Sequence, residues 1–393
     1  MSRNKINIGV VGIGGYAESI TNLVLESNDK LDTDFALIAV CDPALDQFTD
    51  RVKQLKQQGI QVSDNYDDLL NNPDIQAIWL PVPHHLHASF SIRALEAGKA
   101  VMCEKPAAGN LAEVDSMIDA ETKTKLPLLI GFQEIYDPNT LLLKKRLLNN
   151  DFGKIQTVSC RASWPKKLSY YNRNQWAGKA VFNDHIINDS PVTNAMGHFA
   201  NLCLFFAGPS PKQNATPLSV QGQTLRAHNI ENFDTASITA TTDTNIPITL
   251  LLTHAGDQLL NPVIMIHCDN AIITRTLEQI TIEYKDSTPT ETINLILRDR
   301  IPMLQGFADA IQNHPARDNQ IWATLNIARK HVQLIELVSQ LPITSVPNTL
   351  IAHTNKDTDR GTIIPNLMNI FEQAQLSQQR PESLLETIES AHN

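Results

Sequence analysis

Residues 6–17 read INIGVVGIGGYA, a short β-branched and apolar run that ends in closely spaced glycines. The run predicts a buried strand, and apolar residues at Ile20, Leu23 and Val24 predict a helix after the glycines. A strand, a G-x-G-x-x-A turn and a helix form the first unit of a dinucleotide-binding fold, in which the helix N-terminus binds the pyrophosphate. The candidate cofactor-binding residues of this turn are Gly12, Ile13, Gly14, Gly15, Tyr16 and Ala17.

An acidic residue, Asp42, follows the second predicted strand, Phe35–Val40. In a dinucleotide fold such a carboxylate accepts hydrogen bonds from the ribose hydroxyls, and its charge repels a 2′-phosphate. Asp42 therefore favours NAD over NADP as the cofactor. It lies thirty positions (42 − 12) beyond Gly12, and the polar insert 27–34 accounts for most of the excess over the usual ~20. The alternative is that Asp42 only begins the turn at Pro43.

Strands and helices continue to alternate as far as residue 131, with further strands predicted at 75–80, 98–102 and 128–130. This alternation predicts an α/β N-terminal Rossmann domain with a parallel sheet. Ligands bind at the carboxyl ends of the strands in such sheets. Two further strand ends carry candidate cofactor-binding residues. After the strand 75–80 these are Pro81, Val82, Pro83, His84 and His87. After the strand 98–102 they are Glu104 and Lys105, which precede Pro106.

The histidines His84, His85 and His87 raise the alternative of a metal site, because imidazole is a common zinc ligand. No carboxylate or thiol stands nearby at the spacing of a ligand set, and Pro81 and Pro83 indicate a loop that follows the cofactor. We therefore expect no metal.

Beyond residue 131 the pattern changes to consecutive strands joined by short turns, which predicts a large antiparallel sheet. The expected second domain is α+β, with a large, mostly antiparallel open sheet. The predicted boundaries are 1–131 for the Rossmann domain, 132–345 for the substrate and oligomerisation domain and 346–393 for a C-terminal helical extension. The sequence assigns no role to this extension.

A helix is predicted from Asn188-Asp189-Ser190-Pro191 to about Phe206, because a capping side chain and a first-turn proline mark a helix start. Asn194, His198 and Asn201 then form a polar stripe beside the apolar face, as expected of a helix that lines a cleft. A solvated flank, the alternative, would more often carry Lys and Glu. Asn194 and His198 are candidate catalytic and substrate-binding residues.

The stretch 164–176 combines aromatic rings with amide and charged side chains. Sugar and polyol sites need this combination, because rings stack on C–H faces while polar groups bind hydroxyls. Tyr171 and Trp176 are therefore candidate substrate-binding residues. The alternative, that these aromatic residues only anchor a domain interface, is equally compatible with the pattern.

These motifs resemble the Gfo/Idh/MocA family, relatives of glucose–fructose oxidoreductase and inositol dehydrogenase. The matching residues are Gly12-x-Gly14-x-x-Ala17, Asp42, Pro81-Val82-Pro83-His84-x-x-His87 and Glu104-Lys105-Pro106. The resemblance implies that Lys105 contacts the nicotinamide and the substrate, and that His198 is a catalytic histidine. The family usually has Asn where this chain has His84, and Asp where it has Asn194. An amide can orient an imidazole but cannot stabilise an imidazolium as a carboxylate does.

Composition narrows the remaining classes of protein. A chain of 393 residues with 42% hydrophobic and 19% charged residues fits a two-domain globular protein. Its net charge of −10 argues against nucleic acid and anionic membranes as partners. Five scattered cysteines and no apolar leader favour a cytoplasmic location. The resemblance implies a homo-oligomer, a dimer or tetramer.

Together these observations predict an NAD(P)-dependent oxidoreductase that transfers a hydride between the nicotinamide and a hydroxyl or keto carbon of a sugar, inositol or sugar derivative. Lys105 or His198 would take the hydroxyl proton. One alternative keeps a hidden redox step that drives elimination or glycoside cleavage with NAD recycled. The other is a catalytically silent sugar- or nucleotide-sensing regulator, which the Asn194 position favours.

Overall fold

The computed structural model describes residues 5–27, 30–31, 34–295, 300–313, 322–354 and 359–392. The chain divides into two compact units, Met1–Tyr136 with Asp299–Ala328 and Asp137–Arg298 with Arg329–Asn393. These units differ from the boundaries expected at 131 and 345. The late segment, Asp299–Ala328, returns to the first unit, and the tail beyond residue 345 belongs to the second unit.

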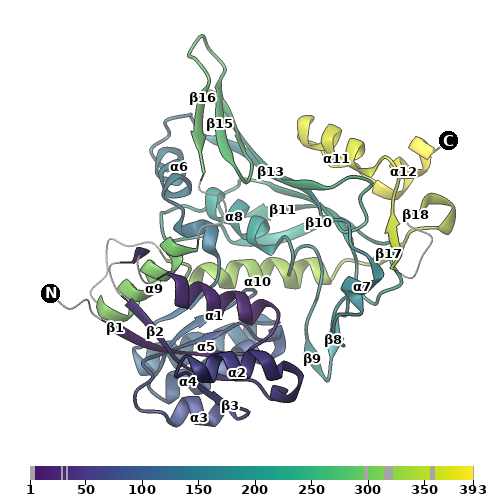
Figure 1. Cartoon of the computed structure of the whole chain (residues 1–393). Helices are drawn as coiled ribbons and strands as arrows, with labels where there is room; N and C mark the ends of the chain where they lie inside the picture. Colours follow the sequence, from purple (N-terminus) through teal and green to yellow (C-terminus); the bar gives the residue numbers. More distant parts are fainter. Residues whose placement is uncertain are drawn as a thin grey trace. The chain divides into compact units, whose positions relative to one another are not determined.

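The first unit is built on six parallel strands in the order β3-β2-β1-β4-β5-β6. In chain order the strands are β1 Lys5–Val11, β2 Asp34–Cys41, β3 Gln61–Ser63, β4 Ala77–Leu80, β5 Ala100–Cys103 and β6 Leu128–Ile130. The main helices between them are α1 Tyr16–Glu26, α2 Thr49–Gln57, α3 Tyr66–Asn71, α4 His87–Glu96 and α5 Leu111–Thr124. This order is doubly wound and reverses between β1 and β4, where such sheets bind ligands. The predicted Rossmann domain is confirmed (Figure 1, purple and blue).

Local sequence explains these elements. Every residue of β4 and β5 is buried, as expected for parallel strands covered on both faces, and both strands are apolar throughout. Helix α5 begins with a capping box, in which Asn110 Oδ1 accepts the Glu113 N–H at 2.9 Å and Glu113 Oε2 accepts the Gly109 N–H at 3.0 Å.

The late segment joins the first unit through aromatic and backbone contacts. Helix α9 (Ile301–Asn313) stacks Phe307 on Phe35 of β2, with the ring centroids 6.1 Å apart. The Ile130 N–H at the end of β6 donates to the Ala323 carbonyl at 2.8 Å. Hydrophobic spacing predicts this helix but does not reveal its distant partners.

The second unit contains a nine-stranded sheet in the order β16-β15-β14-β13-β7-β12-β11-β10-β17. The strands are β7 Ile155–Ser163, β10 Pro217–Arg226, β11 Thr235–Thr242, β12 Ile248–Thr253, β13 Leu260–Cys268, β14 Ala271–Arg275, β15 Gln279–Tyr284, β16 Glu291–Asn294 and β17 Ile343–Ser345. Only the pairs β7–β12 and β10–β17 are parallel among the described strands of this sheet. The predicted large, mostly antiparallel sheet is confirmed (Figure 1, teal and green).

Helices pack on both faces of this sheet at β7. Helix α8 (Gly197–Ala207) contacts β7, and its Cys203 thiol hydrogen-bonds Cys160. The next residue of the strand, Arg161, points to the opposite face, where Arg161 Nε donates to Gln375 Oε1 of α11 (Leu367–Leu376) at 3.1 Å. The tail, which also contains α12 (Leu384–His392), therefore packs on its own sheet.

All five cysteines are buried and none forms a disulfide. Within the described residues, no helix has both the length and the apolar character needed to cross a membrane.

Candidate active site

The turn between β1 and α1 has the geometry of a phosphate-binding loop. Gly12 has a φ of +108°, and a Cβ there would lie 2.7 Å from that of Ala17, so glycine is required. The N–H groups of Gly14, Gly15 and Tyr16 make no hydrogen bond to another described residue. They lie at the N-terminus of α1, where free N–H groups and the helix dipole favour an anion.

Asp42 joins this turn to the end of β2. Its Oδ2 accepts the Ile13 N–H at 3.0 Å, and its Oδ1 accepts the Ala44 N–H at 2.9 Å. Each oxygen keeps a lone pair for a second donor. The Phe48 ring lies over Gly14, because a Cβ on Gly14 would approach Phe48 Cε1 to 2.2 Å. Gly14 is thus needed for this ring contact, which the glycine motif alone does not predict.

His87 connects the loop after β4 with the turn after β5. It is fully buried, with Nδ1 2.6 Å from the Pro106 carbonyl oxygen and Nε2 2.9 Å from that of Val82. Burial lowers the pKa of His87 to about 4, outweighing the two carbonyl groups. His87 therefore holds Val82 and Pro106 together. His84 is also buried, beside His87, and Pro81 and Pro83 flank the loop.

No cluster of three metal-ligating side chains occurs among the residues that the structure describes.

Glu104 is a buried carboxylate at the end of β5. Trp79 Nε1 donates to its Oε1 at 3.3 Å, and the Glu104 charge acts on the Tyr16 hydroxyl of the glycine turn. Burial and the Glu104 charge raise the pKa of Tyr16, so the phenol stays protonated as a donor. A Cβ on Gly131 would lie 2.8 Å from Glu104 Oε2, so the carboxylate requires glycine there. Glu104 therefore fixes the turn that carries Lys105, whose peptide bond to Pro106 is cis.

Helix α8 of the second unit begins at Gly197, whereas the sequence predicts its start at Asn188. Residues 190–196 form turns instead of a continuous α-helix. The Ser190 hydroxyl accepts the Thr193 N–H at 3.3 Å, as a helix cap does, but the Met196 N–H donates to the Pro191 carbonyl, five residues back, at 3.1 Å. This bond interrupts the i to i−4 pattern that a continuous α-helix needs.

The predicted polar stripe of Asn194, His198 and Asn201 is therefore wrong as a single helical face. Asn194 precedes the helix, and Asn201 is fully buried and accepts the Asn214 amide at 2.8 Å. His198 lies in the first turn of α8 and is half-buried.

The buried carboxylate of Asp189 organises the segment before α8. Its Oδ1 accepts the Asn194 Nδ2–H at 2.9 Å, and its Oδ2 accepts the Gly178 N–H at 2.7 Å. Arg173 Nη2 lies 3.8 Å from the same Oδ2. Asp189 is only 4% exposed. An acidic group is thus present beside residue 194, although it comes from five positions earlier.

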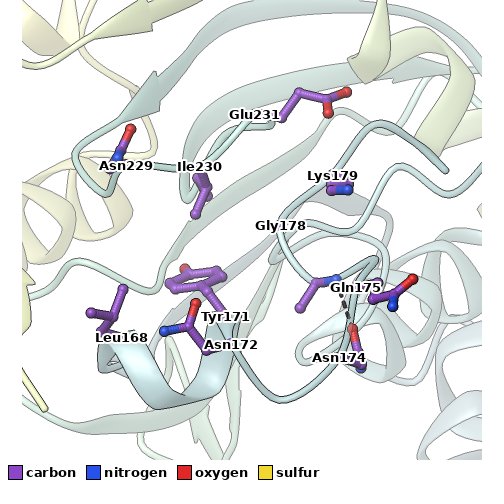
Figure 2. Close-up of a pocket in the computed structure, with 11 residues that line it drawn as sticks. Leu168, Tyr171, Asn172, Asn174, Gln175, Gly178, Lys179, Asn229, Ile230 and Glu231 are labelled. Carbon is purple, nitrogen blue, oxygen red and sulfur yellow. Dashed lines mark hydrogen bonds between the residues drawn. The ribbon is translucent and has the colours of Figure 1, made fainter.

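A cavity of about 780 Å³ opens beside this segment. Tyr171 lines it, together with amides and an apolar floor, and in Figure 2 its ring lies between Ile230 and Asn172. The lining residues are Leu168, Tyr171, Asn172, Asn174, Gln175, Ala177, Gly178, Lys179, Asn229, Ile230 and Glu231. Trp176, the other predicted substrate-binding residue, is not among them. The guanidinium carbon of Arg173 lies 5.3 Å from the centroid of the Trp176 ring.

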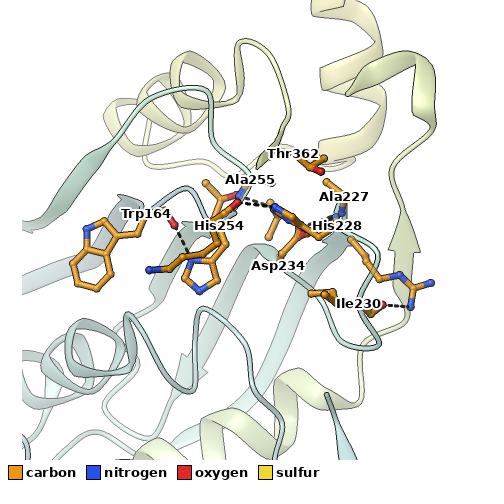
Figure 3. Close-up of polar contacts among 12 residues, drawn as sticks. Trp164, Ala227, His228, Ile230, Asp234, His254, Ala255 and Thr362 are labelled. Atoms are coloured by element: carbon orange, nitrogen blue, oxygen red, sulfur yellow. Dashed lines mark hydrogen bonds and ion pairs between the residues drawn. The ribbon is translucent and has the colours of Figure 1, made fainter. Parts of the chain in front are cut away.

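Two buried histidines hold the strand that leads into this region. His254 Nδ1 lies 3.0 Å from the Trp164 carbonyl oxygen, and burial lowers the pKa of His254 to about 3. His228 places Nδ1 2.7 Å from Asp234 Oδ2 and Nε2 3.0 Å from the Lys166 carbonyl oxygen. Figure 3 shows the bond between His254 and the Trp164 carbonyl, and His228 beside Asp234. The backbone of residues 164–166 is therefore fixed.

Sequence reasoning missed the roles of Asp189, Lys166, Tyr170 and Arg173. Asp189 reads as a helix cap, and the other three stand within a mixed aromatic and polar stretch that gives no pairing. Their signal is the density of cations and rings in 164–176.

Comparisons with known proteins relate most of the first unit to a family. Residues 6–132 match the model of an oxidoreductase family with an NAD-binding Rossmann fold. Over 189 residues the chain is 29% identical to a myo-inositol 2-dehydrogenase of Thermotoga maritima, covering 47% of this chain and 52% of that protein. It is 30% identical over 188 residues to an inositol 2-dehydrogenase of Serratia proteamaculans, covering 48% and 51%. The chain thus matches about half the length of these curated relatives.

Solved structures extend the similarity of fold to most of the chain. The WlbA dehydrogenase of Chromobacterium violaceum, solved with NADH and UDP-GlcNAcA, has a TM-score of 0.68 at 21% identity, covering 86% of this chain and 94% of that one. KijD10, a 3-ketoreductase of Actinomadura kijaniata solved with NADP and TDP-benzene, has a TM-score of 0.68 at 18% identity, covering 88% and 100%. At these identities the likeness shows a shared fold.

Proposed function

Through residues 6–132 the chain belongs to the Gfo/Idh/MocA family of oxidoreductases, and we propose that it is an NAD-dependent dehydrogenase of a sugar or polyol. One observation carries this proposal. The glycine turn, Asp42, the His87 loop and the Glu104–Lys105 turn follow β1, β2, β4 and β5, and a hydrogen bond connects Ile13 to Asp42. A dinucleotide site needs such a row of loops at one sheet edge.

The residues of the first unit fit a dinucleotide. The N–H groups of Gly14, Gly15 and Tyr16 would bind the pyrophosphate, since they lie at a helix N-terminus and bond no other residue that the structure describes. The remaining lone pairs of Asp42 would accept the ribose hydroxyls, and its charge would repel a 2′-phosphate, which favours NAD over NADP. The nicotinamide supplies a hydride acceptor. His87 acts here by holding the Val82 and Pro106 carbonyls in place.

The chain's own chemistry is the removal of a proton from the substrate hydroxyl. Lys105, fixed by the buried Glu104 beside it, and His198, in the first turn of α8, are the proposed acceptors. Asn194, whose Nδ2–H donates to Asp189, would orient the substrate or the imidazole. Tyr171, which lines the cavity, would contact the substrate, and Trp176 would act through its contact with Arg173.

Replacement of Lys105 tests this proposal. We expect Lys105→Met to lower kcat at least about a hundredfold, because general acid–base groups contribute that much, while NAD affinity changes little. Lys123→Met, an exposed lysine in the last turn of α5, is the matched control. Turnover by sugar-dependent NADH formation and NAD affinity by calorimetry are both measured. Undiminished turnover of Lys105→Met would refute the assignment.

The silent-regulator alternative draws on Asn194, since the family's usual Asp is absent there. Absence of turnover across sugars, inositols and sugar acids, with NAD still bound, would establish it. A homo-oligomer and a cytoplasmic location stay predictions from the sequence.

A further inference from the structure

Two cations lie against one aromatic ring in the second unit. The Arg173 guanidinium carbon is 3.7 Å from the centroid of the Tyr170 ring, and Lys166 Nζ is 4.5 Å from the same centroid. Lys166 Nζ also lies 5.9 Å from the Trp164 ring. Cation–π contacts of this kind position the charges but leave them unneutralised.

This cluster, made of Trp164, Lys166, Tyr170 and Arg173, carries more positive than negative charge. Within the described residues, no carboxylate lies within 4 Å of Lys166, and the one carboxylate near Arg173, that of Asp189, is 3.8 Å away. Asp189 already accepts hydrogen bonds from Gly178 and Asn194. Burial, and next the Arg173 charge, lower the pKa of Lys166. The single carboxylate near Arg173 therefore does not balance the two positive charges.

The cluster adjoins the first turn of α8. The Trp164 ring meets Phe199, the residue after His198, edge-on at 6.1 Å, while Asp189 binds Asn194. Contacts therefore connect the approach to α8 with its first turn through Asp189, Arg173, Tyr170, Lys166 and Trp164 in succession. His228 and His254 bond the backbone carbonyls of Lys166 and Trp164, so the chain that carries the Lys166 side chain is held in place.

We propose that Lys166 and Arg173 bind an anionic group, a carboxylate or a phosphate, carried by the sugar-type substrate. This inference rests on the proposed function, because it defines the substrate class of the same site. Charged hydrogen bonds from the ammonium and the guanidinium would hold the anion, while the Tyr170 ring positions both cations. Asp189 keeps Arg173 in place, and its negative charge repels a second carboxylate next to it.

Calorimetric titration of the full-length protein in the presence of NAD tests the proposal without requiring turnover. The probes are D-glucuronate, D-glucose 6-phosphate and D-glucose. We expect at least one anionic probe to bind at least about tenfold more tightly than D-glucose, and the preferred anion identifies carboxylate or phosphate as its source. Lys166→Gln should remove this preference, and Lys166→Arg should retain most of it.

The neighbouring lysine provides a matched control. Lys167 is exposed and its Nζ lies 3.6 Å from Asp359 Oδ2, so Lys167→Gln should leave the preference unchanged. Equal affinity for all three probes, or an anion preference that survives Lys166→Gln, would overturn the inference. Anion binding without NADH formation would support the anion site and count against the proposed dehydrogenase, so the two failures are distinguishable.

Discussion

At the scale of single residues, position 194 shows what a motif can and cannot predict. An amide there suggests that the site lacks an acid, but the structure supplies one from Asp189, whose Oδ1 accepts the Asn194 amide at 2.9 Å. Residue identities in the glycine turn, by contrast, follow directly from backbone demands, as at Gly12. The difference arises because a turn is local, whereas the partner of a side chain depends on the path of the chain between them.

Restoring the family's usual acid should therefore damage this protein. In Asn194→Asp two carboxylates would meet at hydrogen-bond distance in a buried site, and one must be protonated or turn away. We expect the free energy of unfolding at neutral pH to fall by about 1–3 kcal/mol. Chemical denaturation measures it. The double variant Asp189→Asn with Asn194→Asp re-forms an amide–carboxylate pair and should recover most of the loss.

The sign of the pH dependence follows from the same repulsion. Because the folded pair would titrate above its unfolded value, the folded state of Asn194→Asp binds protons more tightly than the unfolded state. The destabilisation is then complete above the raised pKa and diminishes as the pH falls through it. Equal stability of Asn194→Asp and the natural protein at neutral pH would contradict this view of Asp189.

At the scale of elements, helix α8 and its ends show where hydrophobic periodicity stops being informative. The pattern predicts a buried helix ending near Phe206, and α8 ends at Ala207. Its start is displaced to Gly197 because the Met196 N–H bonds the Pro191 carbonyl and interrupts the i to i−4 pattern. The C-terminal end uses a partner that no local signal indicates. Lys144 of α6 (Pro138–Leu148), fully buried, donates to the Phe205 carbonyl at 2.6 Å and also to that of Gly208.

Lys144 should therefore stabilise the helix that carries His198. Lys144→Met keeps the aliphatic stem but leaves carbonyl groups at the end of α8 without a donor, which costs about 1–3 kcal/mol of unfolding free energy. The exposed neighbour gives the control, since Lys145→Met should change stability little. Thermal unfolding followed by circular dichroism compares the two variants. A melting temperature of Lys144→Met equal to that of Lys145→Met would rule out this role.

At the scale of the whole molecule, the two units differ in how far the sequence predicts them. Alternating strands and helices predict the parallel sheet of the first unit, because neighbouring strands pair through local crossovers, but they predict neither β3 nor the return of α9 to this unit. The second sheet depends on pairings that cross long stretches of chain, such as β7 with β12, and no pattern predicts their order. For the same reason the packing of α11 on the face that carries Arg161 could not be foreseen.

The central claim is that this chain oxidises a sugar or polyol hydroxyl and delivers the hydride to NAD. The most direct measurement is reduced nicotinamide formed by the natural protein with a panel of neutral sugars, inositols, sugar acids and sugar phosphates, run in parallel with NAD and NADP. The account predicts stoichiometric NADH with an anionic sugar, and a rate with NAD at least about tenfold above that with NADP, because Asp42 repels a 2′-phosphate. Tightly bound NAD that no member of the panel reduces, or a sugar that is cleaved while no NADH accumulates, would contradict it.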